Sequence, residues 1–251
     1  MSTSTWIIGP SPSMSTETTL PVLDGTCVQR FATAQAGLDE QERLGETLTP
    51  DDAPILIAWQ APRALIVGRS DTRLPGFASA AEELAAQSWP VLVRRSGGSA
   101  CPISPGTLQI ALVRASAGKG SIETNYRALA GLIDEVLSGV GVPCELGERP
   151  GAFCPGRYDL GVGLRKFAGL SQYWRSRGRT VTFTTAASII VEEDVGELCR
   201  VVNLFYERAG GEKRCSPAFL IDLKAAVPGE PCERSFNRIT VVDDVHYFPS
   251  I

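Results

Sequence analysis

Apolar residues recur at helical spacing along several parts of the chain. The clearest case covers residues 125–140, where one face of the predicted helix carries Leu129, Leu132, Ile133, Val136 and Leu137. Gly139 near its end is typical of a helix terminus. Further helices are predicted over residues 26–48, 79–88, 194–208 and 216–226. Ser79, with Glu82 three residues later, indicates a capping box at the start of the second of these.

Short apolar runs bounded by Gly, Pro and Ser predict the strands. We expect them at residues 55–59, 64–67, 90–95, 107–114, 158–162, 166–175 and 179–191. The last three are predicted to be antiparallel neighbours joined by turns at 163–165 and 176–178, whereas residues 96–106 are too rich in Gly and Pro to form a regular element. Helices and strands are intermixed without strict alternation, which favours an α+β fold with a mixed, mainly antiparallel sheet packed with helices.

The length of the chain suits one large domain, because 251 residues with 43% hydrophobic content can bury a sizeable core. Residues 1–20 are rich in Ser, Thr and Pro and are expected to form a flexible tail. Since composition does not change further along the chain, residues 21–251 are expected to form a single domain.

Charge and cysteine content exclude several classes of protein. The net charge of −4 argues against a broad nucleic-acid surface. No run of about 18 apolar residues is present to cross a membrane, and the N-terminus lacks the charged start and apolar core of a secretory signal. The seven cysteines are irregularly spaced without a CxxC pair, which favours a reducing cytoplasm over a disulfide framework.

Motifs exclude several kinds of catalytic site as well. The sequence has neither a GxxxxGKS/T phosphate loop nor a GxGxxG dinucleotide motif. Its single histidine is His246, which argues against a histidine-based catalytic triad or zinc site. An enzyme built from this chain needs Lys, Asp, Glu or Tyr as a base, or a cysteine thiolate that forms without histidine.

Two segments qualify as candidates for chemistry. In Arg94–Gly98 a strand runs into paired glycines, whose bare backbone lets a ligand lie close, although a tight strand-ending turn explains the glycines equally. Cys154 precedes a Pro-Gly turn, and Lys166 follows 12 residues later on the next predicted strand. A lysine ammonium beside a thiol lowers the thiol pKa, so the two side chains are a candidate pair. Cys101 is the rival nucleophile, but no lysine lies at a short spacing from it.

Together these segments resemble the lipoate-protein ligase and octanoyltransferase superfamily, which is related in fold to biotin protein ligase. The resemblance covers residues 25–225 and rests on RRSGG at Arg94–Gly98 and on RKFAGLSQ at Arg165–Gln172. The letters CPGRYDL at Cys154–Leu160 resemble the transferases that take octanoyl from the glycine-cleavage H protein. The resemblance implies a biotin/lipoate protein ligase-like catalytic domain.

The resemblance also implies an activity: a cysteine takes an octanoyl or lipoyl group from a carrier and passes it to a lipoyl domain of a 2-oxoacid dehydrogenase E2 subunit. Cys154 and Lys166 are then the catalytic residues, and neither a cofactor nor a metal is needed. The substrate is expected to lie against Arg95, Ser96, Gly97, Gly98, Tyr158, Asp159, Ala168 and Gly169.

The sequence departs from the family pattern at two positions of the glycine loop. Ile103 stands where many members have a histidine, and Ser99 where a third glycine is common. Two alternatives therefore stay open. One is an ATP-dependent lipoate-protein ligase in which Lys166 holds a lipoyl-adenylate, and the other is a non-catalytic protein that binds lipoyl domains.

Overall fold

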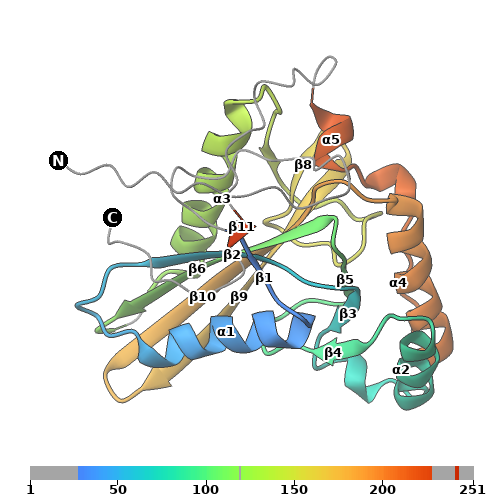
Figure 1. Cartoon of the computed structure of the whole chain (residues 1–251), viewed down its shortest axis with the longest axis horizontal. Coiled ribbons are helices and arrows are strands. Elements are labelled where there is room, and N and C mark those ends of the chain that lie inside the picture. Colours follow the sequence, from blue (N-terminus) through green and yellow to red (C-terminus); the bar gives the residue numbers. More distant parts are fainter. Residues whose placement is uncertain (1–27, 119, 228–240, 243–251) are drawn as a thin grey trace, which may run out of the picture.

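The computed structural model describes residues 28–118, 120–227 and 241–242, and within these residues the larger of two sheets has eight strands (Figure 1). Their spatial order is β11-β1-β2-β6-β10-β9-β8-β7. Neighbouring strands are antiparallel, except that β1 runs parallel to both β11 and β2. The bounds are β1 Val28–Arg30, β2 Ile55–Gln60, β6 Thr107–Ser116, β7 Glu145–Leu146, β8 Leu160–Val162, β9 Arg165–Arg177, β10 Thr180–Ile190 and β11 Val241–Val242.

A smaller sheet of three strands stands beside the larger one, in the order β4-β3-β5. Its strands are β3 Ala64–Val67, β4 Val91–Val93 and β5 Cys101–Ile103. The prediction of an irregular segment over 96–106 is therefore wrong at β5, which pairs antiparallel with β3. A proline within this strand is tolerated because β5 lies at the edge of the sheet, where one row of backbone groups has no ladder to form.

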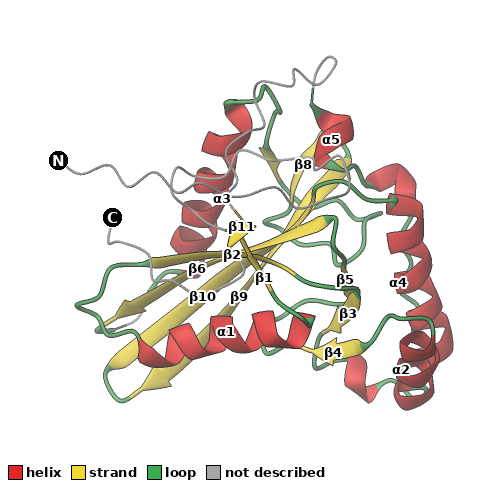
Figure 2. Ribbon diagram, in the orientation of Figure 1, coloured by secondary structure: helices red, strands yellow, loops and turns green. Residues whose placement is uncertain are grey.

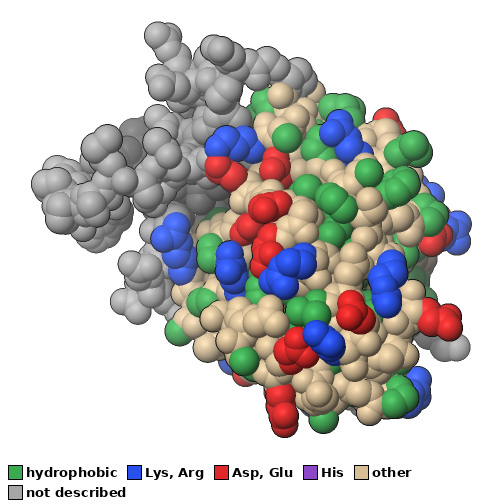
Figure 3. Space-filling view, turned by 90° about the vertical axis from the view of Figure 1, so that its right-hand side faces the viewer, with side chains coloured by type: hydrophobic (Ala, Val, Ile, Leu, Met, Phe, Trp, Pro, Cys, Tyr) green, Lys and Arg blue, Asp and Glu red, His purple; other side chains and the backbone are tan. Residues whose placement is uncertain are grey.

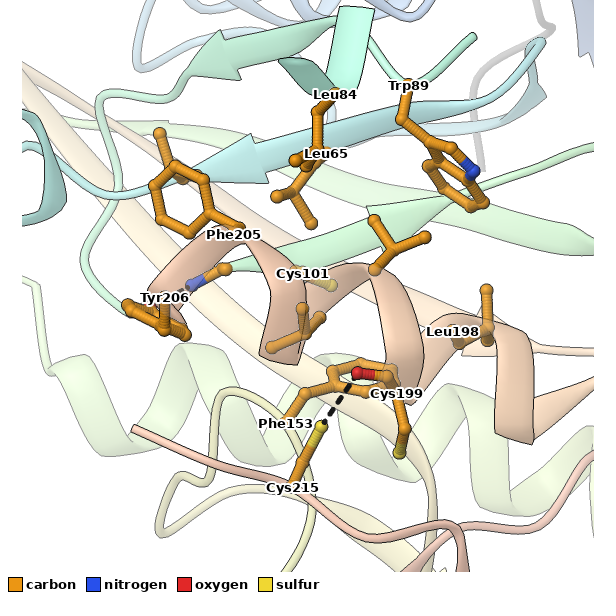
Figure 4. Close-up of a cluster of buried hydrophobic side chains, with 14 of the residues drawn as sticks. Leu65, Leu84, Trp89, Cys101, Phe153, Leu198, Cys199, Phe205, Tyr206 and Cys215 are labelled. Carbon is orange, nitrogen blue, oxygen red and sulfur yellow. Dashed lines mark hydrogen bonds between the residues drawn. The ribbon is translucent and has the colours of Figure 1, made fainter. Parts of the chain in front are cut away.

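Helices cover both faces of the larger sheet and one side of the smaller one (Figure 2). Their bounds are α1 Ala34–Thr47, α2 Phe77–Ala86, α3 Ile122–Ser138, α4 Val195–Ala209 and α5 Leu223–Ala226. Alternation along β2 separates the faces: Ile57 and Trp59 pack in the cluster beneath α1, and Ala58 packs in the cluster beneath α3. α2 and α4 pack against each other beside β5 and enclose a third cluster, part of which is drawn in Figure 4.

The predicted antiparallel meander is confirmed. β8, β9 and β10 follow one another as neighbours, and the turns between them contain Gly163 at φ +57° and Gly178 at φ +59°. These are left-handed conformations that glycine adopts without steric cost. Lys166 accordingly lies on the strand that follows the first turn.

Boundaries differ from the prediction by two or more residues for four of the predicted helices. α3 begins at Ile122 rather than at residue 125, because the Ser121 hydroxyl caps it. α1 begins at Ala34, because the Thr33 hydroxyl caps it and Val28–Arg30 pairs with β2 instead. α2 begins at Phe77, so the capping box predicted at Ser79 is wrong. The helix predicted over 216–226 is reduced to a 3₁₀ turn at Pro217–Phe219 and the short α5. The intervening backbone binds β9 instead, with Ile221 N–H donating to the Lys166 carbonyl at 3.0 Å.

These elements confirm an α+β fold with a mixed, mainly antiparallel sheet. The N-terminal tail predicted over residues 1–20 lies outside the described residues. Across the described ranges, none of the helices has both the length and the apolar character needed to cross a membrane. On the side that carries α2 and α4, basic and acidic side chains are interspersed rather than gathered by sign (Figure 3).

Candidate active site

A pocket lies between α1 and the face of the larger sheet that α1 covers, where the chain leaves β4. Both Cys101 and Cys154 line it. Apolar walls come from Leu38, Ile66, Ile103 and Ala186, and polar groups come from Gln41, Gln109, Ser171, Thr184 and Ser188. A pocket with apolar walls and a few polar groups beside a thiol suits an acyl group whose carbonyl carbon reaches the sulfur.

Cys154 is held in an unusual backbone conformation at the rim of this pocket. Its φ of +43° lies in the left-handed region, which non-glycine residues seldom adopt. Phe153 anchors the loop by burying its ring in the cluster against α4 (Figure 4), which stabilises the fold by about 1.5–3 kcal/mol. The carbonyl groups of both residues accept hydrogen bonds from the Lys166 ammonium. The surrounding structure therefore fixes a strained conformation, as is frequent at functional sites.

Two donors meet the Cys154 sulfur directly. The Ser99 backbone N–H lies 3.2 Å from Sγ, and Nη2 of Arg94 lies 3.3 Å from it. Burial raises the pKa of the Cys154 thiol, but the charges of Arg94 and Lys166 and the Ser99 hydrogen bonds outweigh burial and hold the pKa below its ordinary value. The thiolate form is therefore favoured, as a cysteine nucleophile requires.

The sequence predicts that the Lys166 ammonium pairs with the Cys154 thiol, but in the structure the ammonium has other partners. Nζ donates to the carbonyls of Phe153 at 3.0 Å and Cys154 at 2.7 Å, and pairs with Asp159 Oδ1 at 3.0 Å. An ammonium has three hydrogens, so these three acceptors occupy all of them. Lys166 thus acts on the sulfur through its charge and through the loop it holds, while Arg94 is the cation in contact with the sulfur.

Asp159 is the counterion of Lys166, and both side chains are almost completely buried. Its second oxygen accepts the Gly156 N–H at 3.0 Å, which closes the Pro-Gly turn after the cysteine. Burial raises the pKa of the Asp159 carboxyl, and the neighbouring Lys166 opposes that rise. Asp159 is therefore the partner that neutralises Lys166. The described part of the chain holds no group of three His, Cys, Asp or Glu side chains that could hold a metal ion.

The glycine pair closes around the thiol from the opposite side. Gly98 has φ +105°, and a Cβ there would lie 2.3 Å from Arg94 Nη2 and 2.9 Å from Cys154 Sγ. Only glycine therefore lets the arginine and the sulfur approach each other. Gly97 faces open space, and its carbonyl accepts from Arg94 Nε at 3.0 Å. Ser96 lines the pocket.

The other predicted substrate residues are placed differently. Arg95 lines the rim, where its side chain is 43% exposed and pairs with Glu42 at 3.1 Å. Gly169 lines the pocket, and a Cβ there would lie 2.9 Å from Lys166 Nζ. The remaining five, Gly97, Gly98, Tyr158, Asp159 and Ala168, are outside the pocket lining. Tyr158 stacks on Tyr126 of α3 at 4.2 Å, and Ala168 is buried in the core beneath α3.

Cys101, the rival nucleophile, lies on β5 within the cluster next to α4 (Figure 4). Burial raises the pKa of its thiol, and the negative charge of a nearby Cys154 thiolate raises it further. Its sulfur makes a weak contact at 4.0 Å with the Pro102 carbonyl, and a hydrogen bond with the Ser188 side chain lowers the thiol pKa by less than burial raises it. Cys101 is therefore the less reactive of the two thiols in this pocket.

Sequence reasoning missed Arg94 and the Ser99 N–H as partners of the thiol. Arg94 stands in the quoted RRSGG segment, but the pattern does not say which of the two arginines turns inward. The strand ends at Val93, so alternation no longer determines the direction of the next side chains. The local signal is Gly98, which adopts a positive φ. This conformation lets the loop fold back over Arg94.

Comparisons with known proteins agree on the kind of domain. The family described as the lipoyl protein ligase A/B catalytic domain matches residues 34–211. A Bacillus velezensis protein named octanoyl-[GcvH]:protein N-octanoyltransferase is 34% identical over 157 residues, which are 62% of this chain and 53% of that protein. A protein of the same name from Oceanobacillus iheyensis is 30% identical over 193 residues, covering 76% of this chain and 67% of that protein. The chain spans about half the length of several of these curated relatives.

Solved structures show the same fold. Lipoate-protein ligase A bound with ATP superposes with a TM-score of 0.63 at 19% identity, over 87% of this chain and 88% of that one. A bipartite lipoate protein ligase from Thermoplasma acidophilum, studied with its E2 lipoyl domain, gives a TM-score of 0.59 at 15% identity, over 87% and 86% of the two chains. The predicted biotin/lipoate protein ligase-like fold is thereby confirmed.

Proposed function

Given that the chain belongs to the lipoyl protein ligase A/B catalytic domain family, we propose that it is an acyltransferase that moves an octanoyl or lipoyl group between carrier proteins through a thioester on Cys154. The donor is an acylated glycine-cleavage H protein, and the acceptor is a lysine of a lipoyl domain in a 2-oxoacid dehydrogenase E2 subunit. Relatives named octanoyl-[GcvH]:protein N-octanoyltransferase support this choice over the other activities of the family.

The observation that carries the proposal is the pair of donors at the Cys154 sulfur. Arg94 and the Ser99 N–H approach the same atom at 3.3 and 3.2 Å, at the rim of a pocket with apolar walls. A thiol stabilised as thiolate beside an apolar pocket is what a transfer through a thioester needs. A ligase that activates a free acid with ATP makes no use of such a sulfur.

In the first half of the reaction the Cys154 thiolate attacks the carbonyl carbon of the donor's acyl-lysine amide. A C–S bond forms, the amide C–N bond breaks, and the departing lysine amine takes up the proton that the thiol had released. Arg94 and the Ser99 N–H, which donate to the sulfur before the reaction, would stabilise the oxyanion that develops as the sulfur loses its negative charge. In the second half the acceptor lysine, as a neutral amine, attacks the thioester carbonyl carbon. A C–N bond forms, the C–S bond breaks to return the thiolate, and the amine proton passes to solvent.

Intact-mass analysis in two arms tests the proposal. In the first arm the protein is mixed with octanoylated H protein, without nucleotide, and an apo lipoyl domain is then added. We expect the enzyme to gain the mass of one octanoyl group and to lose it again when the lipoyl domain becomes octanoylated. In the second arm free octanoate, ATP and magnesium replace the acylated donor, and we expect little modification of the lipoyl domain.

Modification in the second arm alone would contradict the proposal and establish the ATP-dependent ligase. Binding of the lipoyl domain with no modification in either arm would establish the non-catalytic alternative. The Cys154→Ser variant is the control for the site of the adduct, since a serine ester at that position is not expected to turn over.

A further inference from the structure

The peptide group between Ser99 and Ala100 is held from both sides, next to the Cys154 sulfur. Its carbonyl, that of Ser99, accepts from Arg94 Nη2 at 2.7 Å. Its N–H, that of Ala100, donates to the Tyr206 hydroxyl at 2.9 Å. The Ser99 N–H, one peptide earlier, donates to Cys154 Sγ. The orientation of this peptide therefore determines where both thiolate donors point.

Tyr206 is itself fixed in place. It lies in α4 within the buried cluster of Figure 4, and its hydroxyl donates to Asp71 Oδ1 at 3.2 Å. The other oxygen of Asp71 accepts the Gly68 N–H at 3.1 Å. Burial raises the pKa of the Tyr206 phenol, so the hydroxyl keeps its proton and can donate to Asp71 while it accepts from Ala100.

The contact between Gly68 and Gly98 leaves the loop little room to move. A Cβ on Gly68 would lie 2.0 Å from the Gly98 carbonyl oxygen. The end of β3 thus supports the glycine loop from one side, and the Tyr206 hydroxyl holds it from the other. Neither Tyr206 nor Asp71 lines the substrate pocket or contacts the sulfur.

We propose that Tyr206 is a positioning residue, whose hydroxyl fixes the Ser99–Ala100 peptide so that the Ser99 N–H and Arg94 both stay directed at the Cys154 sulfur. The inference rests on the proposed role of Cys154 as nucleophile. Asp71 supports it by holding the hydroxyl in the orientation that accepts from Ala100. The contribution of Tyr206 is thus to thiolate stability, through a peptide rather than through contact with the reacting atoms.

Tyr206→Phe tests this with the smallest possible change, because the ring and its packing on Phe205 remain. The measurement is the rate of iodoacetamide labelling of Cys154 against pH, followed by mass spectrometry of the Cys154 peptide. We expect the thiol pKa to rise by about one unit, which lowers the labelling rate about tenfold at pH values below the wild-type pKa. At alkaline pH the two rates should converge, since both proteins are then fully thiolate.

Lys213→Met is the matched control. Lys213 pairs with the same Asp71 oxygen at 3.1 Å and lies 5.2 Å from the centre of the Tyr206 ring, but its side chain is 53% exposed and takes no part in the Tyr206–Ala100 hydrogen bond. Its labelling profile should follow the wild type. Circular dichroism checks folding, and if Tyr206→Phe does not fold, Asp71→Asn replaces it, with a shift in the same direction expected.

The outcomes separate the inference from the proposed function. A Tyr206→Phe profile that superimposes on the wild type overturns the positioning role and leaves the nucleophile untouched. Equal shifts in Tyr206→Phe and Lys213→Met overturn it too, because a change that leaves the Tyr206–Ala100 hydrogen bond in place would then act as strongly as one that removes it. A wild-type Cys154 that titrates like an ordinary cysteine contradicts the activated nucleophile on which both proposals depend.

Discussion

Cys154 and Cys101 line one pocket, yet their surroundings shift the pKa values of the two thiols in opposite directions. Cys154 stands on a loop with positive φ, and a charged guanidinium and a backbone N–H converge on its sulfur. Cys101 stands on a regular strand in a hydrophobic cluster. The pKa of the first thiol is held below its ordinary value, and burial raises the pKa of the second.

The difference shows that burial alone does not set the reactivity of a cysteine. Burial raises the pKa of both thiols. What distinguishes Cys154 is the set of donors, which reach it because the backbone around Gly98 and Cys154 departs from regular geometry. Irregular backbone is therefore what makes a thiolate site possible here.

Replacing each cysteine in turn tests the comparison with the largest expected effect. Cys154→Ala should lower octanoyl transfer by about 1,000-fold or more, because no other group can form the thioester. Cys101→Ala should retain most of the activity. Transfer from octanoylated H protein to an apo lipoyl domain, followed by mass spectrometry, measures both.

Thermal unfolding of the two cysteine variants serves as the folding control. Both side chains are small, so each variant should unfold within a few degrees of the wild type. Loss of transfer in the Cys101 variant with full activity in the Cys154 variant would reverse the assignment.

The local features of this site could be predicted from the sequence. Alternating strands and glycine turns encode the meander that carries Lys166, because these signals act over a few residues. The thiol's partner Arg94 is 60 residues from it, and Tyr206 is 106 residues from Ala100. No periodicity encodes such contacts. The sequence therefore predicts Lys166 as the partner of the Cys154 thiol, whereas in the structure Arg94 makes the contact with the sulfur. The short β5 was missed for a related reason, since three residues with a proline carry almost no strand signal.

The second prediction concerns the buried Lys166–Asp159 ion pair, which supports the Cys154 loop. Lys166→Met leaves Asp159 buried without its counterion and leaves two carbonyls without a donor. Breaking a buried pair in this way should lower the free energy of unfolding by about 3–5 kcal/mol. Acyl transfer should fall at least about tenfold, because the backbone that presents the sulfur is then released. Chemical denaturation and the transfer assay measure the two effects.

Lys224→Met is the matched control for that stability measurement. Lys224 also pairs with a carboxylate, that of Glu192, but both side chains are largely exposed. An exposed pair contributes about 0–1 kcal/mol, so this variant should be close to the wild type. Equal losses in the two variants would mean that the Lys166–Asp159 pair has no special role.

The prediction with the smallest expected effect is the most specific. It tests whether Arg94 causes the difference in pKa between the Cys154 and Cys101 thiols. Arg94→Gln removes the cation in contact with Cys154, so the pKa of that thiol should rise by about one unit or more. The wild-type thiolate persists as the pH falls toward the lowered pKa, whereas the variant becomes protonated earlier. Its iodoacetamide labelling should therefore drop about tenfold at pH values below the wild-type pKa and recover at alkaline pH. Arg95→Gln is the control, since the neighbouring arginine pairs with Glu42 at the pocket rim. If both substitutions leave the labelling profile of Cys154 unchanged, the guanidinium does not set the thiol pKa, and the contrast with Cys101 must come from Lys166 and the Ser99 N–H alone.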